Sequence, residues 1–348
     1  MGKSKSKTLP AIANTGLRMQ DIADAAGVSK MTVSRALRND EYVSARTRAR
    51  IQAVIDRMGY VPDQNAAGFA TGRSGFVATL IPSIEHSIFA STLRGITDIL
   101  GEQGLLPLLG DTDYRLDREE LLIETLLKRR PEGMIVTGGK HTERARKLLQ
   151  HAGIPVVEMW DVPEQPIADS VGFSNHEAGR TMARHLKDRG YRNLAFIGAA
   201  AGDDTRGAAR RQGFLDAVIE LGLNPARVVT FDKPPITTEQ GGQAMTQLLN
   251  QSPEVDAVFC VSDPSAVGAI MQCHRLGLRV PDDIAIAGFG DFEIARASFP
   301  SITTISCDWR ALGEAAARQI IERLKAGDKT LSVSTTLMTF SLVHREST

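Results

Sequence analysis

The sequence predicts an N-terminal all-α head with a helix-turn-helix, followed by an α/β core of two doubly wound parallel-sheet lobes. Between Met19 and Gly59, short amphipathic segments are separated by glycine and by capping residues. From Phe76 onward, almost continuously apolar strands alternate with helical segments, and this alternation restarts near residue 173. Repeated β-α order is typical of a parallel sheet covered by helices on both faces. A length of 348 residues is sufficient for this organisation.

The head contains three predicted helices. Gly27 separates the first two, at a tight turn that needs a residue tolerating positive φ. Ser29 is placed to cap the second helix, which begins at Lys30 and runs to about Arg38. The third helix is expected over Ala45–Met58, after a Ser44 cap and before Gly59. Such a layout is that of a helix-turn-helix, whose second helix enters a major groove.

The exposed face of the second helix carries cations and hydroxyls and no carboxylate. We expect Lys30, Met31 and Arg35 to read bases. The hydroxyls are expected to position the DNA backbone, and they belong to Thr32, Ser34, Ser44 and Thr47. An ordinary three-helix bundle is the alternative that spacing alone leaves open.

Charge is divided unevenly along a chain whose formal net charge is zero. Residues 1–73 hold 12 Lys/Arg and 6 Asp/Glu, which leaves 29 against 35 in the remainder. A cationic head on an anionic body suits a DNA-binding module joined to a body that avoids DNA. Residues 1–17 are rich in Lys, Ser and Thr and are expected to form a disordered tail.

Composition places the chain among soluble proteins, with 42% hydrophobic and 24% charged residues. Three cysteines without metal spacing indicate reduced thiols. The sequence contains no apolar run of about 20 residues and no apolar segment after the N-terminal lysines. We therefore expect a cytoplasmic protein that does not contact a membrane, binds no metal and needs no cofactor.

The runs DIADAAGVSKMTVSRALRN and VSARTRARIQAVIDRMGYVPDQNAAGFATG resemble the head of the lac repressor (LacI/GalR) family of transcription regulators. Motif order, hydroxyl positions and the Gly-Tyr-x-Pro junction coincide over some fifty residues, and a weaker resemblance continues toward the C-terminus. The resemblance implies a homodimer that binds a near-palindromic double-stranded DNA operator. It also implies a head over 18–62 and a hinge helix and linker over 63–74.

In that family the hinge helix places a side chain from each subunit between base steps of the minor groove. The matching position here is Phe69 where the family usually has Leu, and Ala66 lies on the same segment. The resemblance also implies a periplasmic-binding-protein-like core over 75–345, in which the chain crosses between lobes three times. Lobe 1 is expected at about 75–172 and 305–329, and lobe 2 at about 173–304 and 330–345.

Ligands of open α/β sheets bind at the carboxyl ends of strands, and the family places its effector there. Arg210 matches an arginine that binds effector hydroxyls or carboxylates, and Gly290 stands where many sugar-binding members carry Asp. The segments IPVVEMWD, VGFSNHEAGR and AGFGDFEIA are similar to the gluconate-operon repressors within the family. The predicted effector is therefore gluconate or a close relative, and the predicted effector contacts are Ser83, Phe89, Glu158, Asp161, Arg206, Arg210, Ser262, Asp263 and Asp291.

Three alternatives remain open at this point. Two keep the fold and change the effector to a neutral sugar or to a purine, although a chain with 5% aromatic residues offers few rings for stacking a purine. The third is an α/β sugar-modifying enzyme with a basic head. We find no catalytic constellation for it, because the sequence contains no G-x-S-x-G, Walker loop, G-x-G-x-x-G or H-E-x-x-H motif.

Overall fold

The computed structural model describes residues 16–38, 40–61, 73–200, 204–327 and 332–348. Most of the predicted tail and the predicted hinge helix, with Ala66 and Phe69, lie outside these ranges. The chain divides into two compact units, Met1–Arg73 and Ser74–Thr348, which we describe separately.

The first unit is the predicted three-helix head, formed by α1 (Met19–Ala26), α2 (Lys30–Leu37) and α3 (Ala45–Met58). The Ser29 hydroxyl accepts the Thr32 N–H at the start of α2, and Gly27 takes φ 62° in the preceding turn. Gly59 ends α3 in the left-handed region, with φ 63°. Local capping chemistry therefore sets the helix boundaries that the sequence predicted. The three helices bury a small apolar core that includes Ile22, Val33, Ile51, Val54 and Ile55.

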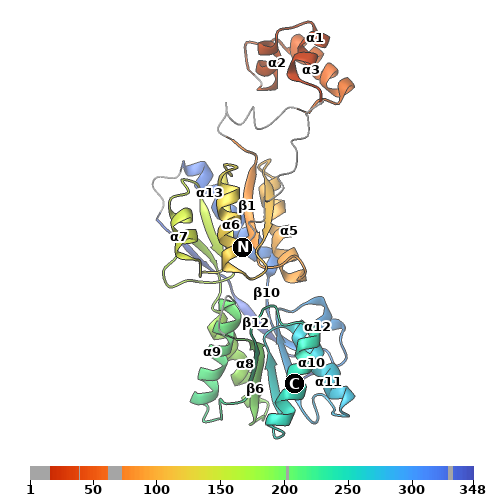
Figure 1. Ribbon diagram of the computed structural model, residues 1–348, viewed down its shortest axis with the longest axis vertical. Helices are drawn as coiled ribbons and strands as arrows, with labels where there is room; N and C mark the ends of the chain where they lie inside the picture. Colours follow the sequence, from red (N-terminus) through yellow and green to blue (C-terminus); the bar gives the residue numbers. More distant parts are fainter. Residues whose placement is uncertain (1–15, 39, 62–72, 201–203, 328–331) are drawn as a thin grey trace, which may run out of the picture. The chain divides into compact units, whose positions relative to one another are not determined.

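The second unit begins with lobe 1, a six-stranded parallel sheet in the order β11-β5-β4-β3-β1-β2. Helices α5 and α13 pack on one face, and α6 and α7 lie against the other (Figure 1). The strands are β1 (Phe76–Ile81), β2 (Leu106–Asp111), β3 (Gly133–Thr137), β4 (Val156–Met159), β5 (Asp169–Gly172) and β11 (Thr335–Leu337). The helices are α5 (Ser87–Gly101), α6 (Leu116–Leu127), α7 (Glu143–Gln150) and α13 (Trp309–Ala326).

Lobe 2 repeats this arrangement with the sheet order β12-β10-β9-β8-β6-β7, in which only β12 is antiparallel to its neighbour. Helices α8 and α9 pack together, and α10 packs against α11. The strands are β6 (Leu194–Ala199), β7 (Val228–Phe231), β8 (Ala257–Cys260), β9 (Ala285–Phe289), β10 (Thr303–Cys307) and β12 (Phe340–Val343). The helices are α8 (Asn175–Asp188), α9 (Thr205–Glu220), α10 (Thr238–Gln251), α11 (Asp263–Arg275) and the short α12 (Glu293–Ala297).

The chain crosses between the lobes three times, but two predicted lobe boundaries are wrong. Residues 305–307 belong to β10 in lobe 2, so lobe 1 resumes only with α13. Residues 335–337 form β11 at the edge of lobe 1, so the return to lobe 2 comes just before β12 rather than at 330. Neither strand is continuously apolar, so neither shows the apolar run by which the other strands were predicted from the sequence.

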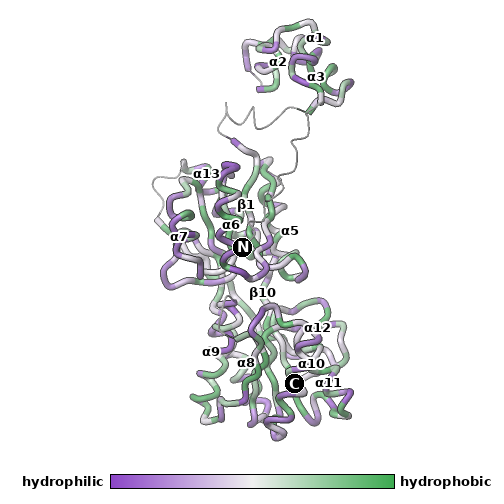
Figure 2. The backbone as a smooth tube through the Cα atoms, in the orientation of Figure 1, coloured by the Kyte–Doolittle hydropathy of each residue, from purple (hydrophilic) through white to green (hydrophobic). Residues whose placement is uncertain are grey.

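Apolar segments run through the middle of each lobe (Figure 2), and the central strands β3, β6, β8 and β9 are buried along their whole length. One cluster of buried apolar residues continues from lobe 1 into lobe 2 through Phe173, Phe289 and Trp309. The carboxyl ends of the strands therefore meet at a packed junction between the lobes. In the parts of the chain that the structure describes, no helix is long and apolar enough to cross a membrane.

Candidate functional site

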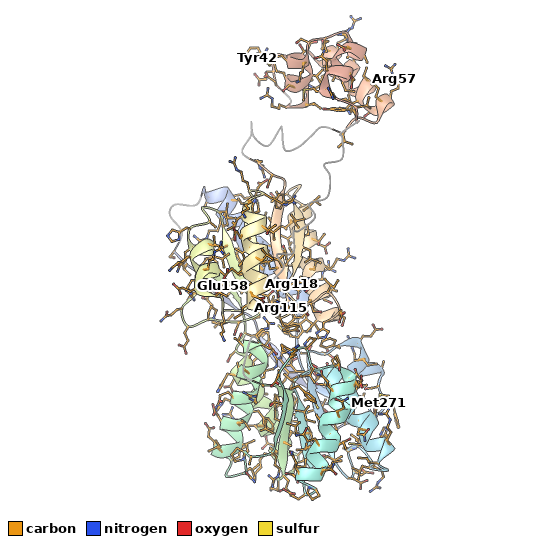
Figure 3. All side chains as sticks on the ribbon, in the orientation of Figure 1. Tyr42, Arg57, Arg115, Arg118, Glu158 and Met271 are labelled. Atoms are coloured by element: carbon orange, nitrogen blue, oxygen red, sulfur yellow. The ribbon has the colours of Figure 1, made fainter. Side chains whose placement is uncertain are left out.

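The head presents one surface suited to a major groove. On α2, Met31 is 59% exposed, and Lys30 and Arg35 are exposed beside it. The Arg35 guanidinium lies 3.9 Å from the Asp40 carboxylate and 5.9 Å from the ring of Tyr42. Figure 3 shows Tyr42 projecting from the head. An exposed ion pair of this length contributes little energy, so Arg35 can exchange it for a base or a phosphate.

The hydroxyls predicted to position the DNA backbone form two similar pairs at helix starts. The Ser29 and Thr32 hydroxyls are 2.8 Å apart at α2, and the Ser44 and Thr47 hydroxyls are 2.9 Å apart at α3. Ser34 is half-buried on α2. Helix N-termini and hydroxyl side chains are frequent phosphate-contacting groups, and these positions suit that role.

The core contains a cavity of about 40 Å³ at the junction of the two lobes. Four of the nine predicted effector contacts line it: Phe89, Arg206, Arg210 and Ser262. They come from α5 in lobe 1, from the first turns of α9, and from the end of β8 in lobe 2. Strand ends and helix N-termini therefore meet at one place, as expected for open α/β sheets.

The two arginines of this cavity are buried without forming an ion pair with any residue that the structure describes. Arg210 donates from Nη1 to Asn175 Oδ1 at 2.6 Å, and its guanidinium carbon lies 4.0 Å from the centre of the Phe289 ring. Its Nε is buried and has no acceptor among the described residues. Arg206 lies over the Tyr114 ring at 6.0 Å. Each arginine is 8% exposed.

Burial lowers the pKa of Arg210 to about 10, and nearby Asp204 partly opposes that shift. The guanidinium is therefore still protonated near neutral pH. Asp204 also lines the cavity, but its carboxylate accepts the Gly207 N–H as the cap of α9. A buried cation that forms no ion pair is energetically costly, so this cavity is suited to an anionic ligand.

Aromatic or imidazole side chains form half of the remaining wall. Trp160 stacks on Trp309 with ring centres 4.5 Å apart, and Phe89 packs against Trp160 at 4.8 Å. Trp160 takes φ 76°, and its indole N–H is buried with no acceptor in the described parts of the chain. The aromatic or imidazole rings lining the cavity are those of His86, Phe89, Tyr114, Trp160, Phe289 and Phe292.

Three predicted contacts from lobe 2 and the first loop of lobe 1 do not line the cavity. Asp263 is fully buried and accepts hydrogen bonds from the Thr304 hydroxyl and the Phe292 N–H. Burial raises its pKa to about 7. Asp291 pairs with Arg345 at 2.6 Å. The Ser83 hydroxyl accepts the Glu85 N–H. These groups stabilise the loops around the cavity.

The two predicted acids in and after β4 are also absent from the wall. Asp161 follows β4, and burial raises its pKa although Arg206 opposes the shift. Its carboxylate accepts the Val162 N–H. Glu158 is fully buried inside lobe 1 (Figure 3) and accepts the Ile167 N–H at 2.6 Å. Its other oxygen lies 3.4 Å from Nε2 of His141.

Gly290 has a structural reason to be glycine. Its φ is 119°, and a Cβ atom there would lie 2.4 Å from the Phe292 ring. Its carbonyl accepts the indole N–H of Trp309 at 2.6 Å. The absence of an acid at this position is therefore explained by local geometry, and the argument for an anionic ligand depends on the arginines.

Ten wall residues were not among the predicted contacts. They are apolar, aromatic or backbone-capping residues, whose sequence pattern is the same in a ligand-binding wall as in an ordinary core. Trp160 and Phe289 directly end β4 and β9, so the strand-end rule that selected their acidic neighbours also covers them. The ten are His86, Ile88, Tyr114, Trp160, Asp204, Pro235, Ile236, Val261, Phe289 and Phe292.

Comparisons with known proteins agree with both units. Residues 18–63 match the model of bacterial regulatory proteins of the lacI family, and residues 183–348 match a periplasmic binding protein-like domain. The chain is 36% identical to the HTH-type transcriptional regulator GntR of Escherichia coli strain K12, over 88% of this chain and 92% of that protein.

Two solved structures extend the comparison. A lacI-family regulator from Silicibacter pomeroyi has a TM-score of 0.87 at 33% identity, over 95% of this chain and 99% of that chain. The lac repressor dimer bound to operator has a TM-score of 0.81 at 25% identity, over 95% and 98%. The chain therefore belongs to the lacI family of bacterial regulatory proteins and is a transcriptional repressor rather than an enzyme.

Proposed function

We propose that this cytoplasmic repressor controls a carbohydrate catabolism operon, and that a small sugar acid bound between the lobes sets its affinity for DNA. Gluconate or a close relative is the effector. The observation that carries the proposal is the pair Arg206 and Arg210, two buried cations that form no ion pair with described residues. An arginine fork binds a carboxylate through parallel hydrogen bonds.

The other donors of the cavity support a ligand rich in oxygen atoms. Arg210 Nε and Trp160 Nε1 are both buried without an acceptor and belong to residues of the same wall. Leaving a buried donor unpaired costs about 1–3 kcal/mol, and the hydroxyls or carboxylate of an aldonic acid would satisfy both. The aromatic rings would pack against the C–H faces of its carbon chain.

The same rings favour a second candidate, a purine base. The low aromatic content of the whole chain was a poor guide, because the rings are concentrated at this cavity. A neutral base would leave two arginine charges without a partner, and we therefore rank it below the acid.

For DNA, we propose a dimer on a near-palindromic operator. Lys30, Met31 and Arg35 contact bases, and Thr32, Ser34, Ser44 and Thr47 contact the backbone. Ala66 and Phe69 belong to the hinge that meets its partner at the dyad. The exposure of Lys30, Met31 and Arg35 on one helix supports this assignment.

Calorimetric titration of gluconate, a keto-gluconate, glucose and hypoxanthine tests the effector class. We expect saturable binding of the acids only, and loss of at least about tenfold in affinity in Arg210→Met, because each tenfold corresponds to about 1.4 kcal/mol and charged hydrogen bonds are worth more. Arg184→Met is the matched control, since Arg184 is an exposed arginine of lobe 2 that pairs with Glu177. Tighter binding of glucose or hypoxanthine than of any acid would reject the sugar-acid effector.

A further inference from the structure

A second, smaller cavity of about 20 Å³ adjoins the ligand cavity and shares two wall residues with it, Tyr114 and Arg206. Its other walls come from the loops after β2 and β3 in lobe 1 and from the start of α9 in lobe 2. The polar lining is supplied by Thr112, Arg115, Thr137, Lys140, Thr205 and Arg206. The two cavities together extend along the junction from α5 to the N-termini of α6 and α9.

The charge of this second cavity is positive. Its wall cations are Arg115, Lys140 and Arg206, and Arg115 is already paired with the carboxylate of Asp117. Its one wall carboxylate, Glu119, is held 2.6 Å from Nδ1 of His141. Burial alone would lower the pKa of His141, but its hydrogen bond to Glu119 and its ion pair with Glu158 outweigh burial and raise the pKa to about 9, so an imidazolium lies against Glu119.

Arg206 provides the observation that points to a ligand. It is more than nine-tenths buried, lines both cavities, and forms no ion pair or hydrogen bond with the residues that the structure describes. Arg210 lines the first cavity and not the second. One carboxylate can use the Arg210 fork, which leaves the charge of Arg206 for a second anionic group.

Resting on the proposed function, we infer that the effector carries two anionic ends and that this second cavity is a phosphate subsite. The carboxylate of a phosphorylated sugar acid binds at Arg210, and its phosphate is held by Arg206 and Lys140 with hydroxyl contacts from Thr112 and Thr205. Phosphate oxygens are strong acceptors for such charge-assisted hydrogen bonds. The aromatic walls enclose the carbon chain between the two ends.

The test is calorimetric titration of gluconate, 6-phosphogluconate, glucose and glucose 6-phosphate into the full-length protein. We expect 6-phosphogluconate to bind at least about tenfold more tightly than gluconate, as expected for an added charge-assisted contact. Lys140→Met should bring that ratio of affinities close to one, and Lys140→Arg should retain it. Lys147→Met is the matched control, because Lys147 is an exposed lysine of lobe 1 that pairs with Glu143 at 3.3 Å, and it should leave the ratio unchanged.

The outcomes separate this inference from the proposed function. Gluconate binding with an equal or weaker affinity for 6-phosphogluconate overturns the phosphate subsite and leaves the sugar-acid effector intact. A Lys140→Met variant that weakens both acids by the same factor also overturns it, because the lysine would then support the fold rather than the phosphate. If neither acid binds, both proposals are rejected together.

Discussion

Arg35 is the residue at which specificity for DNA is most directly tested. It is about half exposed on α2, and its nearest carboxylate, on Asp40, is 3.9 Å away. Arg35→Ala should cost about 1–3 kcal/mol on the cognate operator and relax the preference at one base pair, if the guanidinium pairs with guanine. Competition binding against single-base operator variants measures this.

The control for Arg35 is Thr47→Ala at the start of α3. Its hydroxyl pairs only with Ser44 among the contacts in the described head, and its removal should weaken all sequences by the same factor. Undiminished operator selectivity in Arg35→Ala would remove Arg35 from base readout.

His141 is expected to make the stability of lobe 1 depend on pH. Burial lowers its pKa, but the hydrogen bond to Glu119 and the ion pair with Glu158 outweigh burial, so the folded pKa of about 9 lies above the ordinary 6.5. The folded state therefore binds the proton more tightly, so this contribution is fully present below pH 6.5 and is lost as pH rises through about 9. Each pKa unit of difference corresponds to about 1.4 kcal/mol.

An NMR titration of histidine-labelled protein, with His141 assigned from a His141→Asn variant, measures that pKa directly. Denaturant unfolding at pH 6 and pH 9 gives the accompanying loss of stability. If the His141 resonance titrates at or below pH 6.5, the imidazole is not stabilised in its charged form by Glu119 and Glu158, and the predicted raised pKa is wrong.

At the scale of elements, prediction from sequence succeeded where the deciding interactions are local. The boundaries of α2 and α3 follow from Ser29, Ser44 and Gly59, which act within four residues of their own position. The sequence did not predict strand β10, because its threonines and serine interrupt the apolar run that marks a buried strand. It did not predict β11, because three residues at a sheet edge are too few to show a periodicity.

The same distinction explains the candidate site. Arg206 and Arg210 were predicted because they follow a strand end, which is a local feature, and because Arg210 matches an effector-binding arginine of the resembling family. Asp263, Asp291 and Glu158 also stand at strand ends, but their partners are distant in sequence. Those partners are Thr304, Arg345 and His141, and only the folded chain shows that these acids already face other groups of the protein.

For the whole molecule, regulation requires that the effector and the operator favour different states of the dimer. A ligand shifts such an equilibrium only by its differential affinity for the two states, and the coupling is reciprocal. If the acid lowers operator affinity about 100-fold, the operator must weaken acid binding by the same factor, or about 2.7 kcal/mol. The junction between the lobes is where this coupling would begin, since Trp309 of α13 donates to Gly290 of lobe 2.

The protein contains a built-in probe for this coupling. Its two tryptophans, Trp160 and Trp309, stack on each other at the cavity, and residues 1–73 contain none. Intrinsic fluorescence therefore reports on the cavity even when the head is bound to DNA. Titrating the acid with and without saturating operator gives two dissociation constants for the acid. The reverse experiment determines the affinity for operator with and without the acid. The two experiments should give the same ratio of affinities. Equal acid affinities in the two titrations would contradict control of DNA binding by this ligand, even if the ligand itself were correctly identified.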